Sequence, residues 1–292
     1  MMKLNRVKIL LCLLGAGLSM VVTIAQARDF ELSYEAHSAP VFSQPHDITL
    51  SPDQRYLYVA DNNNDRIAVL DPSTLALLGS FAEGEVSEPH DVVFDVDGRL
   101  LVADTGNSRI AIYQVAGIKG QLIGEYTGEF SRPEGVAVHP NGQVYVTGAS
   151  SSNIVSIKDG KAIARAGGFS SPHDVVVAAD GSVWIADSGN DRLVRMSADL
   201  ETLTIVKGKP FDFNGPRYMD FDSKGRLYVA DKYAHRIKVM TADNNLFYSL
   251  GQDRSGKGPG LFDRPEGVVI HNDQVWFADT YNNRIVRYRI NE

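Results

Sequence analysis

Six residues that each follow a proline carry the side chains in this sequence with the clearest capacity for metal chemistry. They occupy the same place in a segment that recurs six times along the chain. In chain order they are His46, His90, Glu134, His173, Arg217 and Glu266. Imidazole nitrogens and carboxylate oxygens bind zinc at about 2.0–2.2 Å, and a catalytic zinc site uses three such ligands and a water molecule. These residues therefore predict a site for zinc or another divalent metal.

Two ligand sets are open from the sequence. His90, His173 and Glu266 belong to the second, fourth and sixth repeats, so a six-fold ring would space them evenly. His46, His90 and His173 supply three imidazoles, the better zinc donors, from repeats on one half of the ring. A third interpretation needs no metal: Pro-His-Asp can be a turn in which the imidazole bonds a backbone carbonyl and the aspartate caps the strand.

The residues recur because the chain is built from repeats. The six prolines are 44, 44, 39, 44 and 49 residues apart, and the length varies between the motifs rather than inside them. They are Pro45, Pro89, Pro133, Pro172, Pro216 and Pro265. A repeat of this length with no helical periodicity indicates a β-propeller with one sheet per repeat.

Each repeat predicts four antiparallel strands. An apolar strand follows the proline, a turn such as Asp97-Gly98 comes next, and a second strand ends in Ala-Asp in five repeats. A polar loop leads into a third strand that opens with Arg-Ile or Arg-Leu, and a variable fourth strand completes the sheet. We therefore predict an all-β, six-bladed β-propeller of four-stranded blades.

This architecture places the candidate site. The residues after the prolines stand where the chain enters each innermost strand, so they form a ring near the mouth of the central channel. The Asn-rich loops between second and third strands open on the same face. They add Tyr233 and Tyr281, which with Glu134 are the candidate ligand-binding residues.

The ends of the chain predict how the ring closes. The sixth repeat stops after its third strand, at residues 285–290, and has no fourth. A strand at residues 30–34 precedes the first repeat. We expect this N-terminal strand to complete the sixth blade, which removes exposed strand edges.

Other periodic residues are expected to be structural. The aspartates of the Ala-Asp endings should accept backbone hydrogen bonds and pair with the loop arginines. They are Asp61, Asp104, Asp187, Asp231 and Asp279. The third repeat departs, with Thr147-Gly148 and Asn153 in place of Ala-Asp and Arg. Trp184 and Trp276 are expected to pack between blades.

The N-terminus predicts export. A basic start, an apolar run and Ala25-Gln26-Ala27 are typical of a cleaved signal peptide at residues 1–27. Residues 28–292 would then form a single propeller in the periplasm or outside the cell, with no membrane span. The only cysteine, Cys12, lies in this leader, so the mature chain would have no disulfide.

Charge excludes one class of partner. Removing the leader takes away three basic residues and no acidic ones, so the formal charge moves from -7 to -10. Without a basic surplus, nucleic acid is not an expected partner. We expect a monomer.

The motifs resemble those of a known repeat. The Pro-x-Gly/Asp-Val strand start, the Ala-Asp ending and the Asn-x-Arg-Ile loop are similar to NHL repeats over nearly all of the chain after residue 27. The resemblance implies the propeller but not one function, because this scaffold serves enzymes and binding proteins.

The three Pro-His pairs resemble a narrower group. They are similar to the Pro-His motifs with which peptidyl-α-hydroxyglycine amidating lyases hold zinc near the channel. That resemblance implies a metal that polarises the substrate while a base removes a proton and a C–N bond breaks. In such an enzyme Arg217 would bind a substrate carboxylate. Tyr218 would be the base if its pKa were lowered.

Three functional hypotheses follow. The first is a metal site at the channel mouth that binds a small molecule or peptide, with lyase-like activity. The second is a non-catalytic platform for a protein, a peptide or a glycan. The third is a lactonase or lyase of the gluconolactonase-like group, which ranks last because its repeats lack the Pro-His and Ala-Asp pattern.

Overall fold

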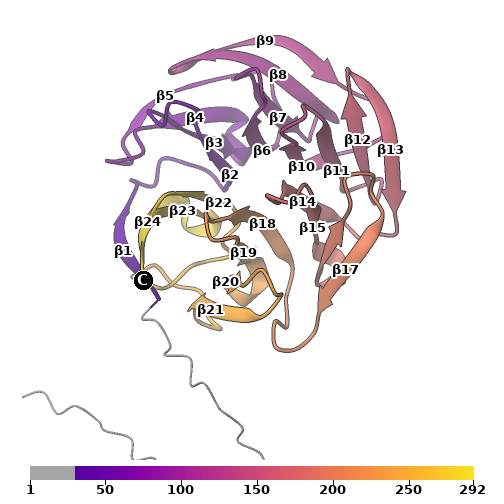
Figure 1. The fold of residues 1–292 in the computed structure, drawn as a ribbon. Coiled ribbons are helices and arrows are strands. Elements are labelled where there is room, and N and C mark those ends of the chain that lie inside the picture. The colour runs from indigo at the N-terminus through magenta and orange to yellow at the C-terminus, as the bar shows by residue number, and fades with distance from the viewer. Residues whose placement is uncertain (1–29) are drawn as a thin grey trace, which may run out of the picture.

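The computed structural model describes residues 30–292, and the expected signal peptide at residues 1–27 lies outside this part of the chain. Within residues 30–292 the chain forms 24 strands and four short 3₁₀ turns. The strands make six four-stranded antiparallel sheets around a central axis, as Figure 1 shows. The prediction of an all-β, six-bladed propeller is confirmed. No helix in these residues is long and apolar enough to cross a membrane.

The strands take equivalent places in each blade. The innermost strands are β2 (Pro45–Leu50), β6 (Pro89–Phe94), β10 (Pro133–Val138), β14 (Pro172–Val177), β18 (Pro216–Phe221) and β22 (Val268–His271). The second strands are β3 (Leu57–Asp61), β7 (Leu100–Asp104), β11 (Val144–Gly148), β15 (Val183–Asp187), β19 (Leu227–Asp231) and β23 (Gln274–Asp279). We number the blades 1 to 6 in this order.

The outer half of each blade follows the same order. The third strands are β4 (Arg66–Leu70), β8 (Arg109–Ala116), β12 (Asn153–Lys158), β16 (Arg192–Met196), β20 (Arg236–Met240) and β24 (Arg284–Asn291). The outermost strands are β5 (Leu77–Phe81), β9 (Lys119–Tyr126), β13 (Lys161–Gly167), β17 (Thr202–Lys207), β21 (Leu246–Gly251) and β1 (Glu31–His37). The 3₁₀ turns η1 (Asn62–Asn64), η2 (Ser188–Asn190), η3 (Lys232–Ala234) and η4 (Thr280–Asn282) follow second strands.

The N-terminal strand closes the ring as expected. Strand β1 pairs with β24 from Glu31–Asn291 to His37–Val286 and is the outermost strand of blade 6, where Figure 1 shows the two side by side. Leu32 is only 4% exposed and joins the apolar cluster that contains Tyr288. The first and last strands of the propeller are therefore held in one sheet.

The core lies in the seams between blades. Six apolar clusters occur among the described residues, and each one joins two neighbouring blades. Trp276 of blade 6 packs with Leu57 of blade 1, and Trp184 of blade 4 packs with Leu227 of blade 5. Both tryptophans therefore pack between blades, as predicted.

The Ala-Asp aspartates of five blades accept hydrogen bonds from the backbone of the segment that leads into the blade. In blade 1, Asp61 accepts hydrogen bonds from the Ser43 amide at 2.8 Å and from Arg66 Nε at 2.7 Å. Arg66 also donates to the Val41 carbonyl at 3.0 Å. Matching Asp–amide and Asp–Arg bonds occur in blades 2, 4 and 6. The structural interpretation of these residues is confirmed there.

Blade 5 differs from the expected pairing. Lys238, and not Arg236, pairs with Asp231 at 2.5 Å and also donates to the Phe211 carbonyl. Arg236 turns outward to Asp253 at 2.7 Å. The prediction of an Asp–Arg pair is wrong for this blade, because Lys238 on the third strand occupies the place of the arginine beside the buried Asp231.

Blade 3 makes the same connections without charge. Ser151 Oγ accepts the Ser131 amide at 2.9 Å, which is the role of the aspartate in other blades. Asn153 donates to the Glu129 carbonyl at 2.8 Å, which is the role of the arginine. The departure from the repeat is therefore a neutral substitute for the ion pair.

Closure by β1 makes the stability depend on Leu32. Leu32→Ala should lower the free energy of unfolding by about 2–4 kcal/mol, because it leaves a cavity against blade 6. Glu31→Ala, an exposed neighbour in the same strand, should change it by less than about 0.5 kcal/mol. Denaturant melts of both variants measure this, and equal effects would contradict closure through a packed strand.

Candidate metal centre

An irregularity at the start of the innermost strands directs the residues after the prolines toward the channel. In blade 1 the pairing of β2 with β3 passes from Pro45–Asp61 to Ile48–Val59, which leaves His46 and Asp47 out of register. Similar bulges occur at the start of β6, β10, β14 and β18. Because bulged residues leave the regular alternation of a strand, a bulge can re-aim a side chain.

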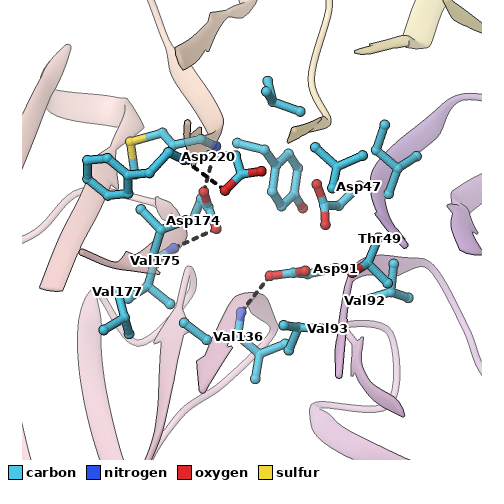
Figure 2. A pocket seen from close by; sticks show the side chains of 18 of the residues that line it. Asp47, Thr49, Asp91, Val92, Val93, Val136, Asp174, Val175, Val177 and Asp220 are labelled. Atoms are coloured by element: carbon cyan, nitrogen blue, oxygen red, sulfur yellow. Dashed lines mark hydrogen bonds between the residues drawn. The ribbon is translucent and has the colours of Figure 1, made fainter. Parts of the chain in front are cut away.

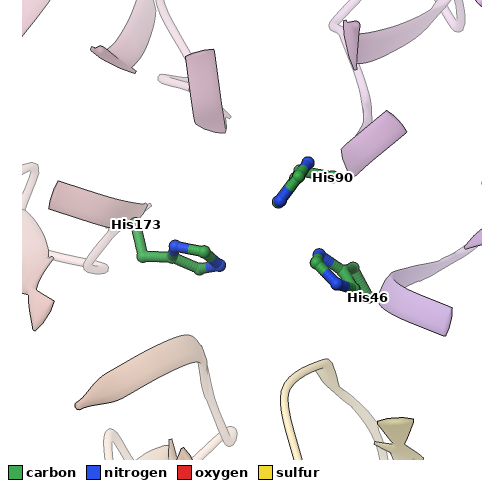
Figure 3. Close-up of side chains that lie close together, drawn as sticks. All are labelled: His46, His90 and His173. Atoms are coloured by element: carbon green, nitrogen blue, oxygen red, sulfur yellow. The ribbon is translucent and has the colours of Figure 1, made fainter. Parts of the chain in front are cut away.

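Three histidines from three blades meet at the channel. Figure 3 shows His46, His90 and His173 converging from their strands. All three are buried, and one nitrogen from each lies within 4.8 Å of the others. Their ring centroids are 4.2 Å apart for His46–His90, 5.7 Å for His90–His173 and 6.3 Å for His46–His173. Imidazole nitrogens bind zinc at about 2.0–2.1 Å, so the three rings would have to move toward one ion to bind it together.

The hydrogen bonds of the rings leave nitrogens free for a metal. His90 Nδ1 lies 2.9 Å from the Glu88 carbonyl and 3.2 Å from Asn62 Nδ2. With its proton on Nδ1, toward the carbonyl, the ring keeps the Nε2 lone pair for a metal. Such a second-sphere bond typically orients a metal-bound histidine. His46 Nδ1 and His173 Nε2 are buried with no hydrogen-bond partner among residues 30–292. His46 Nδ1 can bind a divalent metal, and His173 Nε2 can do so when the ring proton is on Nδ1, which contacts Glu134.

Two carboxylates border the histidines. Glu266, fully buried, places Oε2 at 3.3 Å from His173 Nε2 and 3.8 Å from His46 Nδ1. Glu134 contacts His173 Nδ1 and lies 3.9 Å from His90 Nε2. Glu266 therefore stands beside two of the three candidate ligands.

Two cations balance these carboxylates. Lys232 Nζ lies 2.7 Å from Glu266 Oε1. Arg217 Nη1 lies 2.5 Å from His173 Nδ1, and its Nε is buried without a hydrogen-bond partner in the described chain. Since the two carboxylates and two cations cancel, a divalent ion would give the site a net positive charge and favour an anionic ligand.

Burial and charge set the protonation of the site. Burial lowers the pKa of His46 well below its ordinary value, although Glu266 opposes the shift, and burial also lowers the pKa of His90 against Glu134. Burial alone would raise the pKa of Glu266, but His46, His173, Lys232 and Arg217 outweigh it and hold it well below its usual range. The same balance, led by His173, brings the pKa of Glu134 to about 2. Neutral imidazole and ionised carboxylate are the forms that bind metals.

Of the two predicted ligand sets, the structure favours the histidines. Within the described residues, His46, His90 and His173 are the group whose donor atoms lie close enough to share one ion. The set of His90, His173 and Glu266 was predicted because their blades are evenly spaced around the ring. The side chains meet near the axis of a narrow channel, so the spacing of the blades does not decide which donor atoms come together. Glu266 is a neighbour of the cluster.

Tyr218 does not meet the condition for a base. Its hydroxyl donates toward the His90 and Glu134 carbonyls, at 2.9 and 3.0 Å. Burial raises the pKa of Tyr218 well above 10, and the charges of Asp91 and Asp47 raise it further. The lowered pKa that a base at this position requires is therefore not found. The side chain instead crosses the channel from blade 5 to blades 2 and 3.

Tyr233 and Tyr281, predicted to bind the ligand, lie in the turns η3 and η4 of blades 5 and 6. The ring of Tyr233, 48% exposed, lies 5.6 Å from Lys232 Nζ and 6.0 Å from the Arg217 guanidinium. The ring of Tyr281 lies 5.5 Å from Lys232 Nζ and 4.5 Å from the Arg264 guanidinium. These tyrosines contact the cations at the edge of the site, while Glu134 contacts the histidines directly.

Sequence reasoning missed Lys232, and a break in the repeat marks it. The residue after Ala-Asp donates to the proline carbonyl of the next blade in four blades. These residues are Asn62, Thr105, Ser188 and Thr280. Blade 5 has Lys232 at this place, and its charge reaches Glu266 in blade 6 instead.

A separate chamber lies in the channel. Tyr218 lines this cavity of 450 Å³, whereas the three histidines do not. Figure 2 shows Asp47, Asp91, Asp174 and Asp220 around it. Burial raises the pKa of Asp91 to about 6 and of Asp220 to about 7, and those of Asp47 and Asp174 go well above their ordinary range.

The chamber aspartates join neighbouring blades. Asp91 accepts the Val136 amide at 2.6 Å, Asp174 the Met219 amide at 2.8 Å, and Asp220 the Ile270 amide at 2.7 Å. Each bond runs from one innermost strand to the innermost strand of the next blade. Their first role is therefore to satisfy backbone groups that no strand pairs.

Two glycines allow the blades with histidines to approach. Gly267 of blade 6 lies so close to blade 1 that a Cβ there would be 2.4 Å from the His46 carbonyl oxygen. At Gly135 of blade 3, a Cβ would be 2.7 Å from both the His173 oxygen and Asp174 Cα. Glycine at these two positions sets how near His46 and His173 come to the axis.

Comparisons with known proteins agree with the fold. Residues 87–113 and 169–196 match the NHL repeat. NHL repeat-containing protein 2 of Homo sapiens is 37% identical over 65 residues, which are 20% of this chain and 9% of that protein. The Bos taurus protein is 36% identical over 81 residues, 26% of this chain and 11% of that one. The matched segment thus spans about a tenth of these relatives.

Solved structures share the whole propeller. A streptogramin B lyase has a TM-score of 0.65 and 17% identity, over 90% of this chain and 97% of that one. A catalytically inactive histidine-to-alanine variant of virginiamycin B lyase from Staphylococcus aureus, with quinupristin, has a TM-score of 0.65 and 15% identity. The match covers 89% of this chain and 99% of that one. An auxiliary nutrient binding protein from Bacteroides ovatus has a TM-score of 0.67 and 17% identity, over 86% of this chain and 70% of that one. At such identities the likeness concerns the fold. The chain is a six-bladed β-propeller that contains NHL repeats.

The close approach at Gly267 predicts a steric effect. Gly267→Ala should destabilise the protein by about 1–3 kcal/mol, because its Cβ meets fixed backbone of blade 1. Gly167→Ala is the control, since nothing lies within 4 Å of a Cβ there and its φ suits alanine. Thermal melts of both variants test this, and an unchanged Gly267→Ala melt would contradict the close contact.

Asp220 predicts a pH dependence of stability. Its pKa is about 7 in the folded state and near 3.9 when unfolded, so the folded state holds the proton longer. Stability from this group is present below pH 4 and falls as pH rises toward 7, by at most about 1.4 kcal/mol per pH unit. The free-energy difference between wild type and Asp220→Asn should therefore decrease over this interval. Urea melts at several pH values measure it, and a constant difference would contradict the shift.

Proposed function

We propose that this protein binds a divalent metal, zinc in the first instance, through His46, His90 and His173, and uses it to bind a small molecule or peptide at the channel. The observation that carries the proposal is the convergence of three buried imidazoles from separate blades. Two of their buried nitrogens, which lie 3.3 and 3.8 Å from Glu266, have no hydrogen-bond partner in residues 30–292. Leaving such groups unsatisfied is costly unless a ligand occupies them.

The surrounding residues suggest the ligand's chemistry. A divalent ion in this site would polarise an oxygen of the ligand. Arg217, with an unpartnered buried Nε beside the histidines, is suited to orient a carboxylate. Glu266, next to two histidines, is suited to accept a hydrogen bond or a proton from the bound ligand. We therefore propose an anionic ligand with a carbonyl, hydroxyl or carboxylate oxygen.

Lyase activity is the catalytic form of the proposal. The Pro-His pairs motivated an amidating-lyase-like reaction, and the fold similarity to streptogramin B lyase also concerns an enzyme named as a lyase. Tyr218 stays protonated, so the ionised Glu266 is the candidate to accept a proton, although its lowered pKa makes it a weak base. Peptides ending in α-hydroxyglycine and the depsipeptide quinupristin are the two substrates to assay first.

A binding protein without catalysis is the second candidate. The similarity to an auxiliary nutrient binding protein supports it, as does the buried, hydrogen-bonded state of Tyr218. In this case the same metal would hold a ligand or a protein partner. Binding of a substrate without turnover would distinguish this candidate from the first.

We also propose that the mature chain, residues 28–292, is a monomer in the periplasm or outside the cell. The leader motivates the localisation, and β1 covers the edge of β24 that would otherwise be free for association. Fractionation of cells and light scattering on the purified protein test it.

Metal content is the deciding measurement. Residues 28–292, purified without tag or chelator, should contain near-stoichiometric zinc or another transition metal by elemental analysis. His90→Ala/His173→Ala should lose this metal, whereas His271→Ala, in β22 outside the site, should keep it. Metal that stays in the double variant, or none after reconstitution of folded wild type, would contradict the metal centre.

A further inference from the structure

Two of the seams between blades are closed by a matching pair of residues on the face opposite the histidines. At the seam of blades 3 and 4, Tyr145 donates to the Ala198 carbonyl at 2.8 Å, and Leu200 is buried in the same apolar cluster. At the seam of blades 6 and 1, Trp276 donates to the Pro72 carbonyl at 3.1 Å, with Leu75 buried in its cluster. An aromatic donor and a leucine thus close each of these seams.

The seam of blades 4 and 5 keeps the aromatic residue and loses the leucine. By alignment of the turns, Ala242 corresponds to Ala198, and Asn244 corresponds to Leu200. Asn244 and Leu200 even share a left-handed backbone, with φ of 60° and 65°. Trp184 holds the place of Tyr145, but within residues 30–292 its indole N–H forms no bond to this turn.

A cavity of 340 Å³ opens at this seam. Trp184, Phe221, Leu227 and Met240 give it apolar walls, and Asn244 lines it from the turn. Asn244 Oδ1 is buried and has no hydrogen-bond partner among the described residues. The volume of the cavity falls in the range of small-molecule sites. The site therefore offers an apolar surface, one unused acceptor and one unused donor.

The charges around the cavity are already paired. Arg195 pairs with Asp180 at 2.5 Å and donates to Ser182 at 3.0 Å. Asp222 pairs with the Arg226 Nε at 2.6 Å. Because no side chain here holds a free charge, an uncharged ligand fits better than an ion.

We propose that the cavity between blades 4 and 5 binds a small uncharged molecule that combines an apolar ring with an amide. The amide N–H donates to Asn244 Oδ1, and the amide oxygen accepts from the indole N–H of Trp184. The ring lies against the apolar walls. This second site is separate from the histidine cluster and needs no metal.

The two tryptophans make the test direct, because the chain has only Trp184 and Trp276. A ¹⁵N-labelled sample of residues 28–292 should show two indole N–H signals, assigned with Trp276→Phe. Titration with benzamide should shift the Trp184 signal saturably, with a millimolar dissociation constant typical of a fragment of this size. The Trp276 signal should stay in place.

Variants and analogues separate specific binding from contact with any apolar surface. Asn244→Leu restores the residue of the repeat, should raise the melting temperature, and should abolish the shift. Asn245→Ala, next to it but outside the cavity, should leave the shift unchanged. Benzoate and toluene should shift the Trp184 signal much less than benzamide.

The proposal fails if benzamide at about 10 mM leaves the Trp184 signal unmoved, since a millimolar fragment would then be nearly saturating. It also fails if Asn244→Leu shifts as wild type does. An equal response to benzoate would refute the uncharged class, and an equal response to toluene would refute the hydrogen bonds.

Discussion

The innermost strand of every blade has one edge without a strand partner, and this edge faces the next blade across the channel. Its amide and carbonyl groups are buried, so they need partners that the sheet does not provide. Asp91, Asp174 and Asp220 supply acceptors to the following blade. Thr105 and Thr280 donate to the proline carbonyl of the following blade. The ring is thus held at its centre by side chains, and those side chains must be polar although they are buried.

This requirement explains why a polar site can form in the middle of the protein. In blades 1, 2 and 4 the bulge of the innermost strand presents two successive residues, a histidine at an upper level and an aspartate at a lower level. Tyr218 crosses between the levels and bonds to the backbone of two other blades. The lower level stabilises the ring, which leaves the upper level free to differ from blade to blade. His46, His90 and His173 belong to that upper level, together with Glu134, Arg217 and Glu266.

The fold was predictable from the sequence because it depends on residues that repeat. Proline, Ala-Asp and Arg-Ile recur with a fixed order, and the missing fourth strand of the last repeat indicated closure by β1. The site was predictable only in part. Their equivalent positions in the repeats predicted that His46, His90 and His173 face one channel. The distances between their rings could not be predicted, because they depend on side-chain torsions and on the close approach of blades at Gly135 and Gly267. Protonation was not predictable either, since the raised pKa of Tyr218 follows from burial in a place that only the assembled ring creates.

Departures from the repeat locate the residues that do more than hold the ring. Blade 3 shows that a departure can be compensated, because Ser151 and Asn153 rebuild the lost bonds without charge. At Lys232 the lost bond is not rebuilt. The equivalent residues of four other blades donate to the proline carbonyl of the next blade, whereas Lys232 pairs with Glu266 beside the histidines. Asn244 leaves an acceptor without a partner where a leucine would seal the seam. In a ring of equivalent blades, an uncompensated departure costs stability, and such departures mark the positions for which we propose binding.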